Sequence, residues 1–178
     1  MPDLRVVAVD NESSSRQRIL RATAEVLARS GQSKLSLSEV AAQAGVSRPT
    51  LYRWFASKAE LLDAFGEFER TMFDEGVSRA TAGLRGNDRL DAALRFLVEY
   101  QQSDSGVRVV DIEPEVAIAQ LSRVIPLMRA RLQRLLPGAG GAVKAATAIR
   151  VAVAHYIVRS DDTDQFLSQL RHAVGIKQ

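Results

Sequence analysis

The sequence predicts an all-α protein, and two features of its pattern indicate this fold class. Apolar residues recur every three or four positions, as on one buried face of a helix. Serine stands three residues before Glu or Gln where several of these runs begin, which is the pattern of a capping box. These serines are Ser14, Ser36 and Ser57. Alternation typical of strands is absent, although residues 107–112 leave a short extended segment open.

The helices can be placed in order along the chain. Residues 1–13 lack periodicity and indicate a loose arm, and the first helix is expected to begin near Ser14 or Ser15 and to end at Gly31. Pro126 interrupts a helical stretch over 115–136, so we expect two helices that divide near Ser122. The other expected helices run over 36–44, from 47, from 57 towards 84, and over 87–102, 142–159 and 163–174.

Composition limits the classes of function. The 178 residues are 46% hydrophobic and 25% charged, as in an ordinary globular protein. The absence of cysteine excludes disulfides, a thiolate nucleophile, cysteine-ligated zinc and iron–sulfur clusters. Residues 15–60 hold eight basic and three acidic side chains, whereas 61–178 are neutral. This asymmetry favours an anionic partner for the first part, and a merely solvated basic surface is the alternative.

Residues 36–61 carry the strongest local signal. Two short helices joined by a turn at Gly45 form a helix-turn-helix pattern. On the second helix Leu51 and Phe55 share one face, which we expect to be buried, while Thr50 and Tyr52 point outward. A recognition helix needs this arrangement, because its outer face must reach base edges in the major groove.

The run GVSRPTLYRWFASK over residues 45–58, followed by Leu61, resembles the signature of the TetR family of bacterial transcriptional regulators. Every fixed position of that signature is met, and the preceding SLSEVA over 36–41 fits the second helix of the family. The resemblance covers residues 15–62, about a third of the chain. It implies an N-terminal three-helix DNA-binding domain followed by a C-terminal helical domain for ligand binding and dimerisation.

The resemblance assigns DNA contacts residue by residue. Thr50 and Tyr52 correspond to family residues that contact DNA, and Lys58 to a lysine that contacts a phosphate. Arg48 and Arg53 occupy variable positions and are candidates to read bases, with a plain phosphate contact as the alternative for Arg53. The other residues expected at this interface are Ser36, Ser38, Ser47, Pro49 and Trp54.

The serines, the proline and the tryptophan in that set have structural alternatives. The three serines are helix caps by their spacing, with phosphate contact as a second role. Pro49 suits the first turn of a helix. Trp54 either touches the DNA backbone or packs against the first helix, and its size favours packing.

The last two helices are expected to form a dimer interface, as the resemblance implies. Residues 142–157 are apolar on most sides, and such a helix must be covered all round. The alternative is a helix buried wholly within its own domain. The expected interface residues are Ala145, Ile149, Ala152, Val153, Tyr156, Phe166, Leu167, Leu170 and Val174.

A small apolar or amphipathic effector is a further expectation from the resemblance. Each candidate lining residue has an ordinary core position as its alternative. His155 could supply a polar anchor, with a simply exposed or satisfied histidine as the alternative. The candidates are Phe68, Met72, Phe96, Tyr100, Leu121, Met128, Leu132, His155 and Tyr156.

Catalytic and membrane functions find no support. There is no glycine-rich phosphate loop or serine elbow, and the two histidines lack metal-ligand spacing. Asp161, Asp162 and Asp164 are better explained as helix N-terminal residues than as a cation site. The start of the chain has no apolar signal core, and the most apolar stretch is broken by two charges, so a cytoplasmic protein is expected. No cofactor or metal is expected.

The sequence therefore predicts a homodimeric repressor that an effector releases from a palindromic operator. Its expected parts are a flexible arm over 1–14, a helix-turn-helix domain over 15–60 and an effector-binding and dimerisation domain over 61–178. Two alternatives stay open. One is a DNA-binding regulator without a small-molecule effector, controlled by a protein partner or by its own level. The other is a ligand-binding module that has lost DNA binding.

Overall fold

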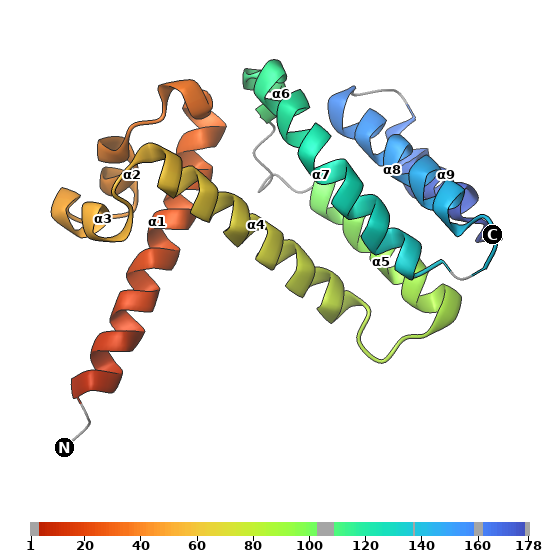
Figure 1. The fold of residues 1–178 in the computed structure, drawn as a ribbon, viewed down its shortest axis with the longest axis horizontal. Helices are drawn as coiled ribbons and strands as arrows, with labels where there is room; N and C mark the ends of the chain where they lie inside the picture. Colours follow the sequence, from red (N-terminus) through yellow and green to blue (C-terminus); the bar gives the residue numbers. More distant parts are fainter. Residues whose placement is uncertain (1–3, 103–108, 137, 159–161, 177–178) are drawn as a thin grey trace. The chain divides into compact units, whose positions relative to one another are not determined.

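The computed structural model describes all residues except 1–3, 103–108, 137, 159–161 and 177–178. Over this part of the chain the regular secondary structure is helical (Figure 1), as the sequence predicts. The helices are α1 (Leu4–Lys34), α2 (Leu37–Gln43), α3 (Arg48–Trp54), α4 (Lys58–Ala80), α5 (Gly86–Gln102), α6 (Val109–Ile112), α7 (Pro114–Arg134), α8 (Gly141–Ile157) and α9 (Phe166–Val174), with a 3-10 turn at Thr163–Gln165.

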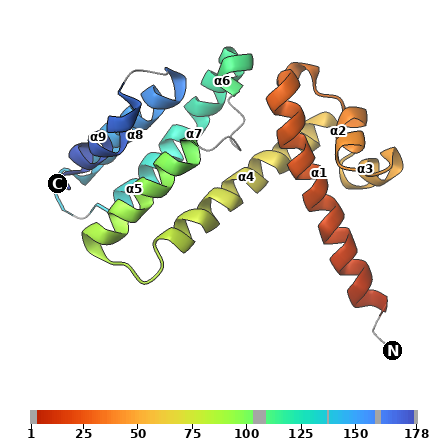
Figure 2. The ribbon, with the colours of Figure 1, turned by 180° about the vertical axis from the view of Figure 1, so that it is seen from behind.

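The chain divides into two compact units. The first contains residues 1–72 and 107–113, and the second contains 73–106 and 114–178. Figures 1 and 2 show α2 and α3 against the C-terminal half of α1 within the first unit. The core of that unit includes Ile19, Val26, Val40, Leu51 and Leu61, each of which is completely buried.

The second unit is a helical bundle. α8 packs against both α7 and α9, and α9 also packs against α5. Leu94, Ala145, Phe166 and Leu170 are buried in its core. None of the helices in the described residues is long and apolar enough to cross a membrane.

Two expectations about helix boundaries were wrong, namely the start of the first helix and the division at Pro126. α1 begins at Leu4, before the expected start at Ser14 or Ser15, because residues 4–13 contain no glycine or proline to stop the helix. At Gly31 the backbone leaves the helical conformation, with φ 74° and ψ 175°, as the expected helix end there requires, and one further helical turn runs to Lys34, so that α1 consists of two helices that meet at this kink. Whether residues 1–14 form a flexible arm stays a prediction.

The second difference concerns Pro126, which lies inside the continuous helix α7 and does not divide it. Proline removes one backbone hydrogen bond, and α7, which packs against α8 elsewhere in its length, continues across that point. The extended segment that the sequence leaves open over 107–112 is not present at Val109–Ile112, which forms the helical turn α6. Residues 107 and 108 lie outside the described residues.

Candidate nucleic-acid interface

Serine caps place the two helices of the helix-turn-helix. Ser36 is extended, and its hydroxyl accepts a hydrogen bond from the Glu39 amide at 3.2 Å, which starts α2. The turn after α2 passes through Gly45, whose φ of 62° is left-handed and suits a residue without a Cβ. Ser38 lies half-buried in the first turn of α2. The predicted cap at Ser36 is confirmed.

The start of α3 is built in the same way. The Ser47 hydroxyl accepts a hydrogen bond from the Thr50 amide at 3.2 Å, and the hydroxyls of Ser47 and Thr50 lie 2.8 Å apart. Pro49 occupies the first turn, where its missing N–H leaves no intrahelical bond unmade. The predicted cap at Ser47 is also confirmed, and it fixes the end of α3 that would enter a groove.

The two faces of α3 differ in burial and chemistry. Leu51 and Phe55 are buried in the core of the first unit. Arg48, Pro49 and Arg53 are exposed, Thr50 is half-buried, and the Tyr52 side chain is 51% exposed. The anchored inner face and the polar outer face are those that the spacing predicts. The outer face can donate hydrogen bonds to an anion from a phenol and two guanidinium groups.

Trp54 ends α3 and packs, half-buried, against the core of the first unit, as its size favours. Its indole Nε1 is buried and has no hydrogen-bond partner among the described residues. An unpaired buried donor costs about 1–3 kcal/mol. Because Trp54 is the sole tryptophan of the chain, its fluorescence reports directly on α3.

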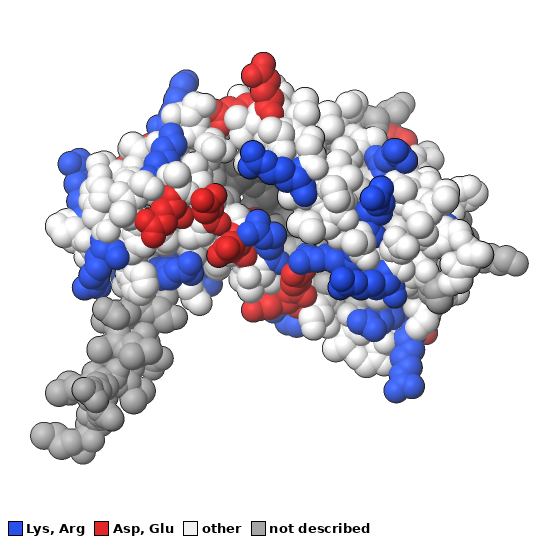
Figure 3. All heavy atoms as spheres, viewed as in Figure 1, with Lys and Arg blue, Asp and Glu red and all other residues white. Residues whose placement is uncertain are grey.

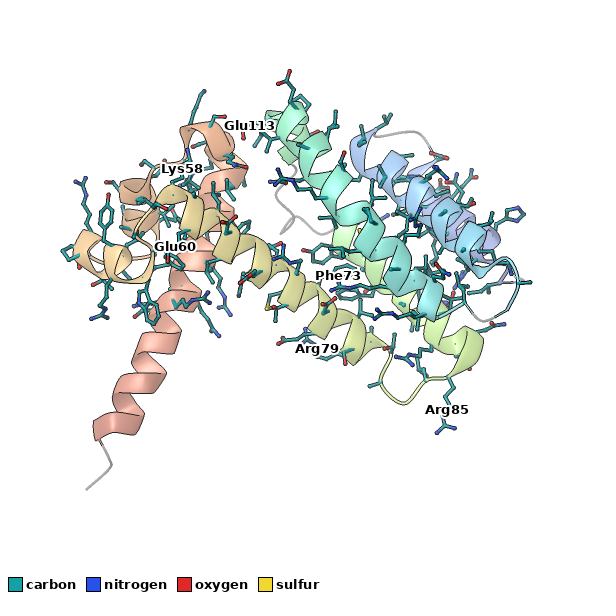
Figure 4. The ribbon with its side chains drawn as sticks, in the orientation of Figure 1. Lys58, Glu60, Phe73, Arg79, Arg85 and Glu113 are labelled. Carbon is teal, nitrogen blue, oxygen red and sulfur yellow. The ribbon has the colours of Figure 1, made fainter. Side chains whose placement is uncertain are left out.

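Lys58 lies at the start of α4 and makes a contact that the sequence did not predict. Its ammonium donates a hydrogen bond to the backbone carbonyl of Ser33 at 2.9 Å. Beside it, the Ser57 hydroxyl accepts from the Glu60 amide at 3.1 Å, and the Glu60 carboxylate accepts from the Ala56 amide at 2.8 Å. The predicted capping box at Ser57 is confirmed, and it orients the lysine that follows (Figure 4).

Glu113 is the residue of this region that sequence reasoning missed. Its carboxylate accepts hydrogen bonds from the backbone amides of Gln32 and Ser33 at the end of α1, the latter at 2.8 Å. A hydrogen bond from the Ser33 side chain, the two amides and the nearby Lys58 charge lower the pKa of this carboxyl, against the opposing effect of desolvation. No local signal identifies this contact, because its partners lie about eighty residues apart.

Basic side chains are spread over the outside of the first unit. Figure 3 shows Lys and Arg side chains over the end of the unit that holds α2 and α3. Among them, Arg48 and Arg53 come from α3 itself. On α1, Arg18 and Arg21 are exposed. This surface has the charge that a polyanion requires.

The residues expected around an effector fall in both units. Phe68 packs against the core of the first unit, and Met72 is 39% exposed at its end. Leu121 and Tyr156 are half-buried in the second unit. Met128 and Leu132 pack against the core of that unit.

Aromatic rings cluster inside the second unit. Phe73 of α4 lies 5.5 Å from Phe96 and 5.1 Å from Tyr100, measured between ring centroids (Figure 4). A Cβ at Gly76 would lie 2.2 Å from the Phe96 ring, so glycine is what lets the ring approach α4. His155, in contrast, stacks on Phe166 at 4.2 Å and bonds Gln169 through Nε2 at 2.8 Å.

Most of the residues expected at a dimer interface lie within the core of the chain itself. Val153, Tyr156 and Leu167 are half-buried. On this face α8 is therefore covered by its own chain, through packing on α7 and α9. The buried residues of the set are Ala145, Ile149, Ala152, Phe166, Leu170 and Val174.

The opposite face of α8 is uncovered. Val143 is 71% exposed, Ile157 37% and Val158, which caps the helix, 60%. Thr147, Arg150 and Ala154 are exposed between them, at the three- and four-residue spacing of one helical stripe, which is therefore apolar except for Thr147 and Arg150. The described residues contain no group of three or more His, Asp or Glu side chains placed to hold a metal ion.

Comparison with known families adds an independent observation. Residues 19–65, which span the helix-turn-helix and the start of α4, match the family described as bacterial regulatory proteins of the tetR family. The transcriptional activator FasR of Mycolicibacterium smegmatis is 34% identical over 109 residues, which cover 57% of this chain and 50% of FasR. The chain thus spans about half the length of the curated relatives it matches.

Solved structures extend the likeness of fold to the whole chain. SCO4454, a TetR-family transcriptional regulator from Streptomyces coelicolor, has a TM-score of 0.69 at 17% identity, over 92% of this chain and 95% of SCO4454. The SmeT–triclosan complex has a TM-score of 0.70 at 18% identity and covers 90% of each chain. These similarities agree with the helical architecture of both units.

Proposed function

The chain belongs to the TetR family of bacterial transcriptional regulators, and on this premise we propose that it is a homodimeric repressor that binds a palindromic operator. TetR-family regulators are not enzymes, in agreement with the absence of catalytic motifs in the sequence. The observation that carries the proposal is the outer face of α3, where exposed Arg48, Tyr52 and Arg53 surround a helix start fixed by the Ser47 cap.

The proposed contacts divide by chemistry. Arg48 and Arg53 read base edges in the major groove, because a guanidinium bonds guanine in a bidentate way. Tyr52 and Thr50 contact the phosphate backbone through their hydroxyls. Lys58 neutralises a phosphate by its charge while its ammonium stays bonded to Ser33.

Dimerisation places two copies of α3 on successive half-sites, about one helical turn of DNA apart. We assign the contact between copies to the uncovered stripe of α8, which carries Val143, Ala154 and Ile157. These exposed apolar residues favour contact with another protein surface over contact with water, and the exposed Arg150 on the same stripe would supply a charged contact there. The half-buried Val153 and Tyr156 extend the same surface.

Release from DNA would follow from binding of a small apolar or amphipathic effector in the second unit. The Phe73, Phe96 and Tyr100 rings supply an aromatic surface suited to such a compound. A ligand that binds the DNA-incompetent state better shifts the population towards it. Triclosan, bound in the SmeT complex, is the first compound to test.

Selection of genomic fragments by the purified protein at two salt concentrations, followed by footprinting, tests the proposal. The expected result is a discrete protected inverted repeat. Weak binding to all fragments that disappears at higher salt would refute operator recognition. Light scattering on the same preparation checks the dimer.

Single variants then separate the roles on α3. Arg48→Ala should relax the sequence preference at one position of each half-site, at a cost of about 1–3 kcal/mol in operator binding. Tyr52→Phe should weaken binding to all sequences alike, since it removes only a phosphate contact. Arg134→Ala, on α7, is the charge-matched control and should change neither quantity. If wild type and Arg48→Ala show the same sequence preference at every position of the half-site, Arg48 does not read a base.

Addition of triclosan to the footprinted complex tests the effector. If triclosan abolishes protection of the operator by wild type but has a smaller effect on Tyr100→Ala, the effector site lies at the aromatic cluster. Protection unchanged by triclosan and by a panel of apolar compounds would favour the alternative of a regulator without a small-molecule effector.

A further inference from the structure

The end of α1 is held by a residue from a distant part of the sequence. The kink at Gly31, with φ 74° and ψ 175°, interrupts the helical hydrogen-bond ladder of α1. Amides that follow such a break have no carbonyl one turn earlier to bond. The Glu113 carboxylate accepts from two of them, Gln32 and Ser33, and so replaces the missing partners.

Gly31 is needed for this contact in two ways. Its positive φ is a conformation that L side chains rarely adopt. A Cβ at this position would also lie 2.8 Å from Glu113 Cδ and 2.9 Å from Glu113 Oε2. The sequence therefore supplies both the break in α1 and the space that the carboxylate occupies.

The backbone of Ser33 is hydrogen-bonded through both its amide and its carbonyl. Its amide donates to Glu113 Oε1 at 2.8 Å, and its carbonyl accepts from Lys58 Nζ at 2.9 Å. Lys58 is the first residue of α4 and follows closely on Trp54, the last residue of α3. Two hydrogen bonds thus connect Glu113, through the backbone of Ser33, to Lys58 at the start of α4, and Figure 4 labels the Glu113 and Lys58 side chains.

Glu113 also occupies a junction in the chain. It follows α6, which packs on α1 in the first unit, and it is joined by one peptide bond to Pro114, the first residue of α7. Any displacement of the start of α7 is therefore passed by covalent connection to the residue that holds the end of α1. The hydrogen bonds from the Ser33 side chain and from the two amides lower the pKa of Glu113 and so favour its ionised form.

We propose that Glu113 is a positioning residue for DNA binding, which holds Ser33 and Lys58 so that the lysine and the start of α4 keep the arrangement that the operator requires. This inference rests on the proposed DNA-binding function and deepens it. Glu113 itself does not touch DNA in this proposal. It links the start of α7 to a phosphate-binding lysine.

Three substitutions at two positions test the proposal in the full-length protein. Glu113→Ala removes both acceptor oxygens, and Glu113→Gln keeps one. Glu115→Gln is the matched control, because Glu115 is an exposed carboxylate two residues further along, in the first turn of α7. Hydrogen exchange at the Gln32 and Ser33 amides and affinity for the footprinted operator are measured for each protein.

The expected results are graded. Glu113→Ala should speed exchange at both amides and weaken operator binding about tenfold, within the usual range of coupling between sites. Glu113→Gln should lie between Glu113→Ala and wild type, and Glu115→Gln should match wild type. In a Lys58→Met background, Glu113→Ala should cause no further loss of affinity, because its effect acts through that lysine.

The outcomes separate this inference from the proposed function. If wild type binds no genomic fragment specifically, the DNA-binding proposal fails and this one fails with it. If wild type binds its operator and Glu113→Ala binds equally well, only the role of Glu113 is refuted. A tenfold loss that persists in the Lys58→Met background would also refute it. Glu113→Gln carries the comparison if the alanine variant does not fold.

Discussion

The ion pair between α5 and α9 allows a quantitative prediction about the second unit. The Asp91 carboxylate accepts from Arg171 of α9 at 2.6 and 2.9 Å and from Arg95 of its own helix at 2.8 Å. The hydrogen bond from Arg171 contributes most to lowering the pKa of Asp91, to about 2 from 3.8, against an opposing desolvation effect. The side chains of Asp91 and Arg171 are only 21% and 20% exposed, so solvent screens the pair weakly.

The magnitude follows from that pKa. A carboxyl held at about 2 instead of 3.8 stabilises the folded state by about 2 kcal/mol when it is ionised. Asp91→Asn should therefore lower the free energy of unfolding at pH 7 by about 2 kcal/mol. For a protein of this size, that change corresponds to a melting temperature lower by about 4–8 °C.

The pH dependence has a definite sign. Because the folded pKa lies below the unfolded value, the contribution of Asp91 is fully present above about pH 4 and disappears as the pH falls towards 2. Urea unfolding followed by far-UV circular dichroism at pH 7, 5 and 3 measures it. Wild type and Asp91→Asn should differ by the full amount at pH 7 and 5 and by only about half of it at pH 3.

A second carboxylate on α5 provides the control. Glu99 is exposed on the same helix, and Glu99→Gln should change the free energy of unfolding by less than about 0.5 kcal/mol at every pH. The reasoning is wrong if Asp91→Asn is as stable as wild type at pH 7. It is equally wrong if the difference between the two proteins is the same at pH 3 as at pH 7.

Three further changes probe the first unit and the proposed dimer. Leu51→Ala should lower the free energy of unfolding by about 2–5 kcal/mol, because Leu51 is fully buried. Urea unfolding followed by Trp54 fluorescence measures this loss, and a loss clearly below that range would contradict the prediction. Ser57→Ala removes the hydroxyl that caps α4 and should lower the free energy of unfolding by about 1 kcal/mol. Thermal unfolding checks this, and an unchanged melting temperature would contradict it. Val143→Asp should yield monomers by light scattering, and a persistent dimer would exclude the α8 stripe as the interface.

The parts of the fold that sequence predicts well are those that neighbouring residues determine. Ser36, Ser47 and Ser57 cap α2, α3 and α4 because each hydroxyl reaches an amide three residues ahead, a distance fixed by the chain itself. The faces of α3 follow from helical spacing alone, so Leu51 turns inward and Tyr52 outward. The three caps and the buried and exposed faces of α3 were therefore predictable from sequence, whereas the contacts of these residues with DNA stay predictions.

The errors arise where tertiary contacts outweigh a local preference. Pro126 disfavours a helix interior, yet α7, which packs against α8, continues through it. Gly31 breaks α1 as the sequence predicts, but the sequence does not show that Glu113 accepts from the amides beyond the break. Neither feature can be recognised from the few residues around the proline or the glycine.

α8 illustrates the same limit for an interface. Apolar residues on all sides require that the helix be covered, but they do not say which side is covered by the chain itself. In the structure Ala145, Ile149 and Ala152 face the core of their own unit, and Val143 lies exposed. A substitution at Ala145 would therefore disturb folding and association together, whereas one at Val143 acts on association alone. This difference makes Val143 the informative position for the proposed dimer.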